Sequence, residues 1–199
     1  MQKDNFKYAI ALTGGIATGK STVSNLFMLH GLLTIDTDKI AHKLLDEHSA
    51  ALKDMFGEEY VYNNKTVRKK LGELIFNNVN EKKKLEKFLH PLIKQEVIRK
   101  SLIFDDQKKP YLVDIPLFFE NENYNIRNSV VVYAPQSLQL KRLMSRDKCS
   151  ADEANIRINN QMNIEKKIDK ATFIIDNSKD LKSLQDEVEK IKLFLLKVV

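Results

Sequence analysis

Apolar residues along the chain follow two different periods. Five short runs are rich in β-branched or apolar residues, and each is long enough for one buried strand. The runs are YAIAL (8–12), LLTI (32–35), YLVDI (111–115), SVVVYA (129–134) and TFIID (172–176). Segments with helical spacing lie between them, for example 21–29 and 137–145. Strands that alternate with helices predict an α/β fold with a five-stranded parallel sheet flanked by helices.

The interval between the second and third runs has a different pattern. From 39 to 105 no apolar run is as strong as the five, and apolar residues recur at helical spacing, most clearly over 67–76 and 81–104. We therefore predict a helical, substrate-binding insertion within a single domain. The predicted core comprises residues 1–48 and 108–199, and the predicted insertion comprises residues 49–107.

Two features refine the predicted helices. Pro91 lies inside the longest helical pattern, and proline removes a backbone donor, so we expect the helix to restart or kink near His90. At the end of the chain, apolar residues recur at a spacing that predicts one helix packed on the core. The predicted buried face of that helix comprises Leu181, Leu184, Val188, Ile191 and Leu195.

Positive charge is concentrated in the predicted insertion. The chain has 33 Lys and Arg against 27 Asp and Glu, a formal net charge of +6. The segment 65–100 alone contains eleven basic residues and four Glu, a net +7, so the rest of the chain is close to neutral. Such a block is typical of a surface that binds nucleic acid, a membrane or a phosphate-rich small molecule, and equally of a solvated helix face.

Composition and the first residues bear on the compartment. Hydrophobic residues make up 43% and charged residues 30%, as in ordinary globular proteins. The single cysteine, Cys149, cannot form an intrachain disulfide. The first residues lack the apolar core of a signal peptide, and no apolar run approaches the roughly 18 residues of a membrane span. We expect a cytoplasmic protein, a monomer or weak oligomer, with no membrane partner.

The most informative motif follows the first predicted strand. Residues 12–22 read LTGGIATGKST and fit Gly14-x-x-x-x-Gly19-Lys20-Ser21, the pattern of a phosphate-binding loop between a strand and a helix. Its backbone N–H groups and the positive end of the next helix bind phosphates. We expect Lys20 to reach the β- and γ-phosphates of ATP and the Ser21 hydroxyl to bind Mg²⁺. The predicted nucleotide contacts are Gly15, Ile16, Ala17, Thr18, Gly19, Lys20, Ser21 and Thr22.

Other motifs separate the classes of protein that use such a loop. A GTPase needs Asp-x-x-Gly after a strand, but the match at 54–57 follows a helical pattern, and 177–180 has the lysine of the guanine motif one place late. A motor ATPase needs a glutamate beside its strand-terminal aspartate, but Ile115 and Pro116 follow Asp114. The remaining class is a small-molecule kinase with a helical substrate insertion and an arginine-bearing lid.

Two aspartates are candidates for the residue that activates the acceptor. Asp36 and Asp38 follow the second predicted strand, at the sheet edge where open α/β sheets bind ligands. A carboxylate at this place can accept the proton of an attacking hydroxyl. One of the two can instead cap the next helix.

The predicted lid comprises residues 140–165. Arg142 and Arg146 are four residues apart on one face of its first helix. Ser150 and Glu153 have the spacing of a capping box that begins a second helix. An arginine that a lid delivers to transferring phosphate can contribute about 10³–10⁵ in rate.

Together the motifs resemble those of the dephospho-coenzyme A kinase family over essentially the whole chain. The segments that carry the resemblance are ALTGGIATGKSTV, TIDTDKIAHKLL, VRKKLGELIF, LHPLI, VDIPLFFE, QLKRLMSRD, INNQM and FIIDN, in this order. LHPLI and DIPLFFE are far more specific than the loop. The resemblance implies a P-loop NTP hydrolase fold. It also implies transfer of the ATP γ-phosphoryl group to the ribose 3′-hydroxyl of dephospho-CoA, the last step of coenzyme A synthesis.

The resemblance also implies roles for individual residues. The implied catalytic residues are Asp38, which handles the acceptor hydroxyl, and Lys20, Arg142 and Arg146. The implied Mg²⁺ ligands are Ser21 and Asp114, and Asn177 is implied to lie near the adenine. The implied acceptor-binding residues are Asp38, His42, Arg68, His90, Pro116, Leu117 and Glu120.

A few positions depart from the family pattern. His42 and Thr172 stand where the family often has arginine and aspartate, and Ala17-Thr18 replaces Gly-Ser. A mostly neutral imidazole cannot reproduce the charged fork of arginine, so we expect weaker acceptor binding or compensation by a neighbour such as Lys43.

Two other functions stay open at the level of sequence. One is a related kinase that acts on a nucleoside monophosphate or another small alcohol. The other is an ATP-responsive protein that binds RNA or DNA through the basic insertion, although the family resemblance removes nucleic acid as the preferred partner.

Overall fold

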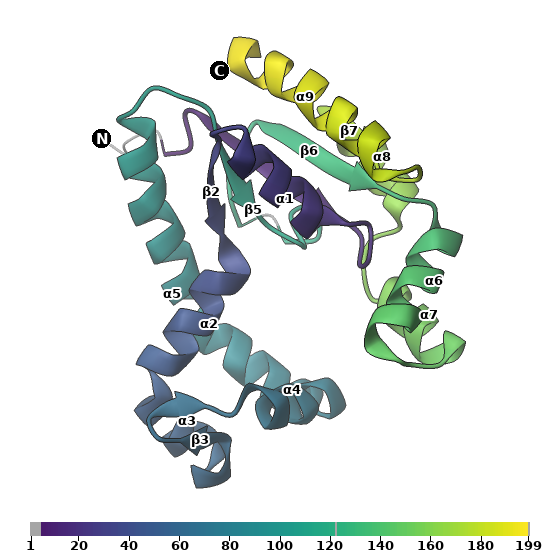
Figure 1. Cartoon of the computed structure of the whole chain (residues 1–199). Helices are drawn as coiled ribbons and strands as arrows, with labels where there is room; N and C mark the ends of the chain where they lie inside the picture. Colours follow the sequence, from purple (N-terminus) through teal and green to yellow (C-terminus); the bar gives the residue numbers. More distant parts are fainter. Residues whose placement is uncertain (1–4, 122, 199) are drawn as a thin grey trace. The chain divides into compact units, whose positions relative to one another are not determined.

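The chain forms two compact units, one of residues 1–35 with 101–199 and one of residues 36–100. The computed structural model describes residues 5–121 and 123–198 (Figure 1). The predicted insertion, 49–107, overlaps most of the second unit. That unit begins earlier in the chain because the helix after the second strand groups with it.

A five-stranded sheet forms the centre of the first unit, with the order β2-β5-β1-β6-β7. The strands are β1 (Ala9–Gly14), β2 (Leu33–Asp36), β5 (Tyr111–Asp114), β6 (Asn128–Tyr133) and β7 (Phe173–Asp176). Strand β1 pairs in parallel with β5 and β6, and β6 pairs in parallel with β7. All five predicted strands are present. Their register places Asp114 beside Leu12 and Val132 beside Gly14, so the phosphate loop begins between the ends of two neighbouring strands.

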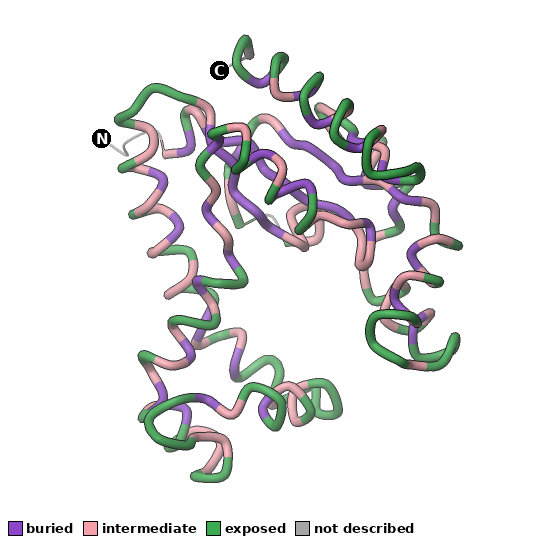
Figure 2. Tube along the Cα trace, in the orientation of Figure 1, coloured by how far each residue is buried: buried purple, intermediate pink, exposed green. Residues whose placement is uncertain are grey.

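Two helices that are distant in sequence share one core cluster with the sheet. They are α1 (Lys20–Leu29) and α9 (Leu181–Val198), and they lie close together in Figure 1. Val23 and Phe27 of α1 pack with Leu184 and Leu195 of α9, and all four are at most 2% exposed. Figure 2 shows the buried strands beneath them. Leu181, predicted on this buried face, is instead 59% exposed, because it begins the helix.

The other helices of the first unit follow β6. They are α6 (Gln136–Asp147), α7 (Ala151–Asn159) and α8 (Ile164–Lys170), and α6 packs on α7 while α8 packs on β6. Thr172, one of the departures from the family pattern, joins β6 to β7. Its Oγ1 accepts from the Ser129 N–H (3.0 Å) and its N–H donates to Ser129 Oγ (3.2 Å). In each bond a side-chain hydroxyl oxygen accepts from a backbone N–H, a role that the threonine hydroxyl can fill.

The second unit is mainly helical and has its own core. Its elements are α2 (Thr37–Glu47), α3 (Ser49–Phe56), a 3₁₀ turn (Glu58–Tyr60), β3 (Val61–Tyr62), β4 (Lys65–Thr66), α4 (Arg68–Asn77) and most of α5 (Val79–Asp105). Leucines 45, 52, 71, 85 and 89 form the buried cluster. The hairpin of β3 and β4 was not predicted. It turns at Asn63 and Asn64, whose positive φ values (49° and 57°) are those of a tight hairpin turn.

Helix α5 runs through Pro91 as one α-helix. The predicted restart near His90 is therefore wrong, although the proline still removes one donor from the helix. Leu85, Leu89 and Val97 are buried at helical spacing on both sides of the proline, so packing holds the helix together. In the described part of the chain, no helix is long and apolar enough to cross a membrane.

Candidate active site

The loop between β1 and α1 is built to bind phosphate. Gly19 (φ 91°) and Ala17 (φ 61°) adopt left-handed backbone conformations that curl the chain. The Thr18 N–H and hydroxyl both donate to Gly15 O, at 3.3 and 2.9 Å. Within the described residues, no side chain caps the start of α1 and its first turn has no acidic residue. Its first N–H groups and positive end are therefore available to an anion.

The lysine of the loop is paired with a buried carboxylate. Lys20 Nζ forms an ion pair with Asp114 Oδ1, and the two side chains are only 16% and 7% exposed. Asp114 ends β5, the strand next to β1, so the sheet brings the two residues together. A charge pair shielded from water is stronger than one at the surface. The arrangement places a cation and a hard oxygen ligand at the end of the phosphate loop.

Asn177 braces the second half of the loop. It is buried directly after β7, and its Nδ2 donates to Thr18 O at 2.7 Å. The backbone carbonyl oxygen of Asn177 accepts from Arg142 Nη2 of α6 at 3.0 Å. A Cβ at Gly19 would lie 2.1 Å from this Nδ2. The asparagine therefore requires a glycine at position 19, in addition to the requirement set by the positive φ.

We predict that Gly19→Ala weakens ATP binding at least about tenfold. The new methyl group would displace Asn177, and the left-handed conformation costs an L-residue about 1–2 kcal/mol. Titration calorimetry with ATP measures the loss. Gly72→Ala is the matched control, because Gly72 lies within α4 and nothing lies within 4 Å of its added Cβ. Unchanged ATP affinity in the Gly19 variant would contradict the described loop.

The arginines of the predicted lid differ in their surroundings. Arg142 is half-buried, and besides its bond to Asn177 it has a buried Nη1 without a partner among the described residues. Arg146 is exposed and pairs with Asp147, which also pairs with Arg157 of α7, both at 2.7 Å. The hydrogen bond from Arg146, together with the charge of Arg157, lowers the pKa of Asp147. Asp147 therefore ties α6 to α7.

The second helix of the predicted lid begins with the predicted capping box. The Ser150 side chain accepts from the Glu153 N–H, and the Glu153 carboxylate accepts from the Ser150 N–H, a complete capping box. Together the two bonds satisfy backbone donors that a helix start leaves free. They fix the point where the chain reverses between α6 and α7.

The segment after β5 lies against the phosphate loop from another side. Pro116 O accepts from the Thr13 hydroxyl at 3.0 Å, and Leu117 is half-buried. Glu120 Oε1 accepts from the Met162 N–H at 3.0 Å. In the first unit, Pro116 of the DIPLFFE motif therefore lies beside the start of the loop, and Glu120 lies beside the segment that follows α7.

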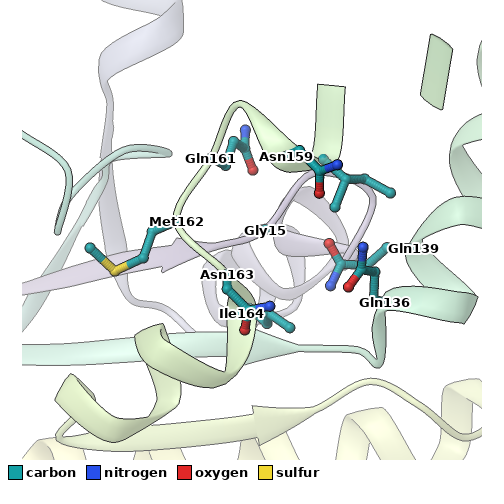
Figure 3. A pocket seen from close by; sticks show the side chains of 9 residues that line it. Gly15, Gln136, Gln139, Asn159, Gln161, Met162, Asn163 and Ile164 are labelled. Atoms are coloured by element: carbon teal, nitrogen blue, oxygen red, sulfur yellow. The ribbon is translucent and has the colours of Figure 1, made fainter. Parts of the chain in front are cut away.

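A cavity of about 160 Å³ adjoins Gly15. Figure 3 shows carboxamide side chains around it, from the start of α6, from the end of α7 and from the chain that follows α7. Those labelled are Gln136, Gln139, Asn159, Gln161 and Asn163. Gln161 Oε1 also accepts from the Ile16 N–H of the loop at 2.8 Å.

The second unit contains four of the residues predicted to bind the acceptor substrate. Asp36 is the N-cap of α2, because its side chain accepts from the Lys39 N–H at 2.9 Å. Asp38 lies exposed in the first turn of that helix, and His42 is exposed one turn further on. The sequence left open which of the two aspartates caps the helix. The structure shows that Asp36 is the cap, so the Asp38 carboxylate remains accessible to a substrate.

Two further predicted residues lie in the same unit. Arg68 begins α4 and is 3.8 Å from Asp46 through Nη2, with half of its side chain exposed. His90 is exposed on α5. Both can reach solvent, which an acceptor-binding residue requires.

Within the described residues, no group of three His, Cys, Asp or Glu could hold a metal ion. Mg²⁺ needs no such group in kinases, because one or two protein oxygens are enough when phosphates and water supply the others. Ser21 is exposed at the start of α1 and Asp114 ends β5. These hard oxygen donors fit Mg²⁺.

Sequence reasoning missed two residues that hold the loop, Gln161 and Lys167. Lys167 is completely buried, and its Nζ donates to Gly14 O at 3.0 Å. A weak signal existed, because Lys167 is three residues after Ile164 and so continues the buried face of α8. In the sequence IEKKIDK, however, it looks like one of several solvated lysines.

The sheet order and the phosphate loop are those of a P-loop kinase. The same fold is found in shikimate kinase from Acinetobacter baumannii, with a TM-score of 0.54, 16% identity, and coverage of 95% of this chain and 93% of that one. Comparisons of sequence identify the family more narrowly.

The chain belongs to the dephospho-CoA kinase family, whose model matches residues 8–183. The dephospho-CoA kinase of Sulfurimonas denitrificans is 53% identical over 191 residues, which cover 94% of this chain and 96% of that protein. The enzyme of Helicobacter pylori strain J99 is 44% identical over 193 residues, 96% of this chain and 98% of that protein. The structure of dephospho-CoA kinase from Campylobacter jejuni has a TM-score of 0.77 at 38% identity, with 96% and 98% of the chains covered.

Proposed function

We propose that this protein transfers the γ-phosphoryl group of ATP to the ribose 3′-hydroxyl of dephospho-CoA, giving coenzyme A and ADP. The observation that carries the proposal is the match of the dephospho-CoA kinase family model to residues 8–183, which include the phosphate loop and both lid helices. The geometry of the loop supports the ATP-binding part of the proposal independently of that match.

The donor phosphates bind the loop. The proposed contacts are Gly15, Ile16, Ala17, Thr18, Gly19, Lys20, Ser21 and Thr22. The backbone N–H groups and the uncapped start of α1 attract the anionic chain. Lys20 exchanges Asp114 for the β- and γ-phosphates, so its charge meets the negative charge that develops during transfer. Asn177 is proposed to contact the adenine as well as brace the loop.

Ser21 and Asp114 are the residues that would hold Mg²⁺. When bound, the ion would supply a compact positive charge that offsets the negative charge of the phosphates. When Lys20 moves to phosphate, Asp114 would lose the ion pair at its Oδ1.

The lid arginines complete the charge around the transferring group. Arg142 is the stronger candidate, since its buried Nη1 has no partner among the described residues and an oxyanion would satisfy it. Arg146 would have to exchange Asp147 for phosphate. We propose both as catalytic residues that stabilise the transition state.

Asp38 is proposed to accept the proton of the 3′-hydroxyl and to align that oxygen for attack. The residues proposed to bind the rest of the acceptor are His42, Arg68, His90, Pro116, Leu117 and Glu120. The basic segment 65–100 offers cations to the pyrophosphate of the acceptor. A cytoplasmic location and a monomeric or weakly associating state are proposed from the sequence; light scattering tests the second.

The function is tested by ADP release from Mg-ATP with dephospho-CoA, AMP, CMP, shikimate or no acceptor. We expect stimulation by dephospho-CoA alone, with phosphate found on the 3′-oxygen by ³¹P NMR. Stimulation by a different acceptor would contradict dephospho-CoA as the substrate but would still support a kinase activity. Salt-sensitive binding of polynucleotides without any acceptor-dependent release would instead support the nucleic-acid function.

A further inference from the structure

A lysine that no part of the proposed mechanism uses lies buried beneath the phosphate loop. Lys167 of α8 is 0% exposed, although lysine is among the residues least often buried. Its Nζ is 3.0 Å from Gly14 O, 3.3 Å from Pro116 O and 2.8 Å from Glu120 Oε1. An ammonium group has three donors, so these oxygens satisfy it completely.

The ion pair explains how the lysine can be buried. Glu120 supplies the counter-charge, and its Oε1 also accepts from the Met162 N–H at 3.0 Å. Its second oxygen, Oε2, is buried and has no hydrogen-bond partner among the described residues. The carboxylate therefore depends strongly on Lys167. Loss of the lysine alone would leave a buried charge uncompensated, which is strongly destabilising.

The bond from Lys167 to Gly14 O has a geometric consequence for the loop. The peptide group is planar and trans, so fixing the Gly14 carbonyl also fixes the Gly15 N–H on the opposite side. The position is crowded: a Cβ at Gly14 would lie 2.8 Å from both Thr18 Oγ1 and Val132 O. Two residues further on, Gln161 Oε1 accepts the Ile16 N–H at 2.8 Å. The segment 161–167 thus holds the first half of the loop at two points.

We propose that Lys167 is a positioning residue for phosphoryl transfer. It orients the Gly14–Gly15 peptide, and thereby the start of the phosphate loop, while Glu120 keeps its charge compensated. The effect on turnover rests on the proposed function, but the effect on the loop does not. The competing explanation is that Lys167 serves only to neutralise Glu120.

The double variant Lys167→Met/Glu120→Gln separates the two explanations. Methionine fills similar volume without charge, and glutamine keeps an oxygen for the Met162 N–H while its NH₂ group replaces the unpartnered Oε2. No charge is left unpaired, so the double variant should fold even if Lys167→Met alone does not. The single variant Glu120→Gln measures how much the Glu120 carboxylate contributes to the binding of dephospho-CoA. Lys166→Met, an exposed neighbour in α8, is the control.

Selective ¹⁵N-glycine labelling reports the loop directly. The chain has six glycines, of which Gly14, Gly15 and Gly19 lie in or beside the loop and Gly31, Gly57 and Gly72 lie elsewhere. In the double variant we expect the loop signals to move and the other three to stay. Relative to Glu120→Gln alone, we expect kcat of the double variant to fall about 10²-fold with little further change in the KM for dephospho-CoA, because small displacements of reacting groups can have effects of that size.

Three results would overturn the proposal. One is recovery of wild-type kcat in the double variant, which would reduce Lys167 to a counter-ion. Another is loop glycine signals that match those of the wild type. The third is an equal loss of kcat in Glu120→Gln alone with unmoved loop signals, which would assign the effect to the carboxylate. A wild-type protein inactive with dephospho-CoA would contradict the proposed function, while the glycine spectra would still test the positioning role.

Discussion

Replacing Lys20 by alanine is expected to lower kcat for phosphoryl transfer about 10³-fold or more, comparable with the loss of a preorganised charge or donor at other active sites. Lys20 is mostly shielded from water beside Asp114 at the start of α1. Its charge is therefore poorly screened, and water cannot replace it. Single-turnover measurements of ADP formation isolate the chemical step from product release.

Controls separate this effect from a loss of folding. Lys20→Ala also removes the partner in a buried ion pair, so its melting temperature must be measured beside its activity. Lys182→Ala removes an exposed lysine of α9 and should retain wild-type turnover. A folded Lys20 variant with full activity would show that the loop does not hold the transferred phosphate.

The strands and the phosphate loop were predictable because their signals are local. A buried parallel strand is a continuous apolar run, and the glycines and lysine of the loop lie within one short segment. The fold and the family followed from the order of such segments. The β3–β4 hairpin was missed because each strand has two residues, too few to show a period.

Other features depended on contacts between distant residues. Lys167 and Gly14 are 153 positions apart, and the charge of the lysine suggests solvent rather than burial. The continuity of α5 through Pro91 reflects packing of apolar residues on both sides, which outweighs a local preference for a break. The sequence could name Asp36 and Asp38 as a pair, but only the Lys39 N–H bond showed which one caps α2.

Because Asp36 caps α2 and Asp38 does not, a large effect on turnover is expected from a change at Asp38. Asp38→Asn is expected to lower kcat about 10²–10⁴-fold, the usual contribution of a positioned general base, and to leave ATP affinity nearly unchanged. The side chain is exposed in the first turn of α2, so the amide replaces the carboxylate without a loss of packing. An amide cannot accept the hydroxyl proton, whereas it still accepts a hydrogen bond.

Asp36→Asn provides the matched control two residues away. Asparagine caps helices about as well as aspartate, so this variant should keep both its stability and its turnover. Comparing kcat and the Kd for ATP in the two variants therefore isolates the proton-accepting role of Asp38. If turnover falls in the Asp36 variant and is unaffected in the Asp38 variant, the carboxylate that activates the acceptor is Asp36, and the N-cap of α2 has the catalytic role as well.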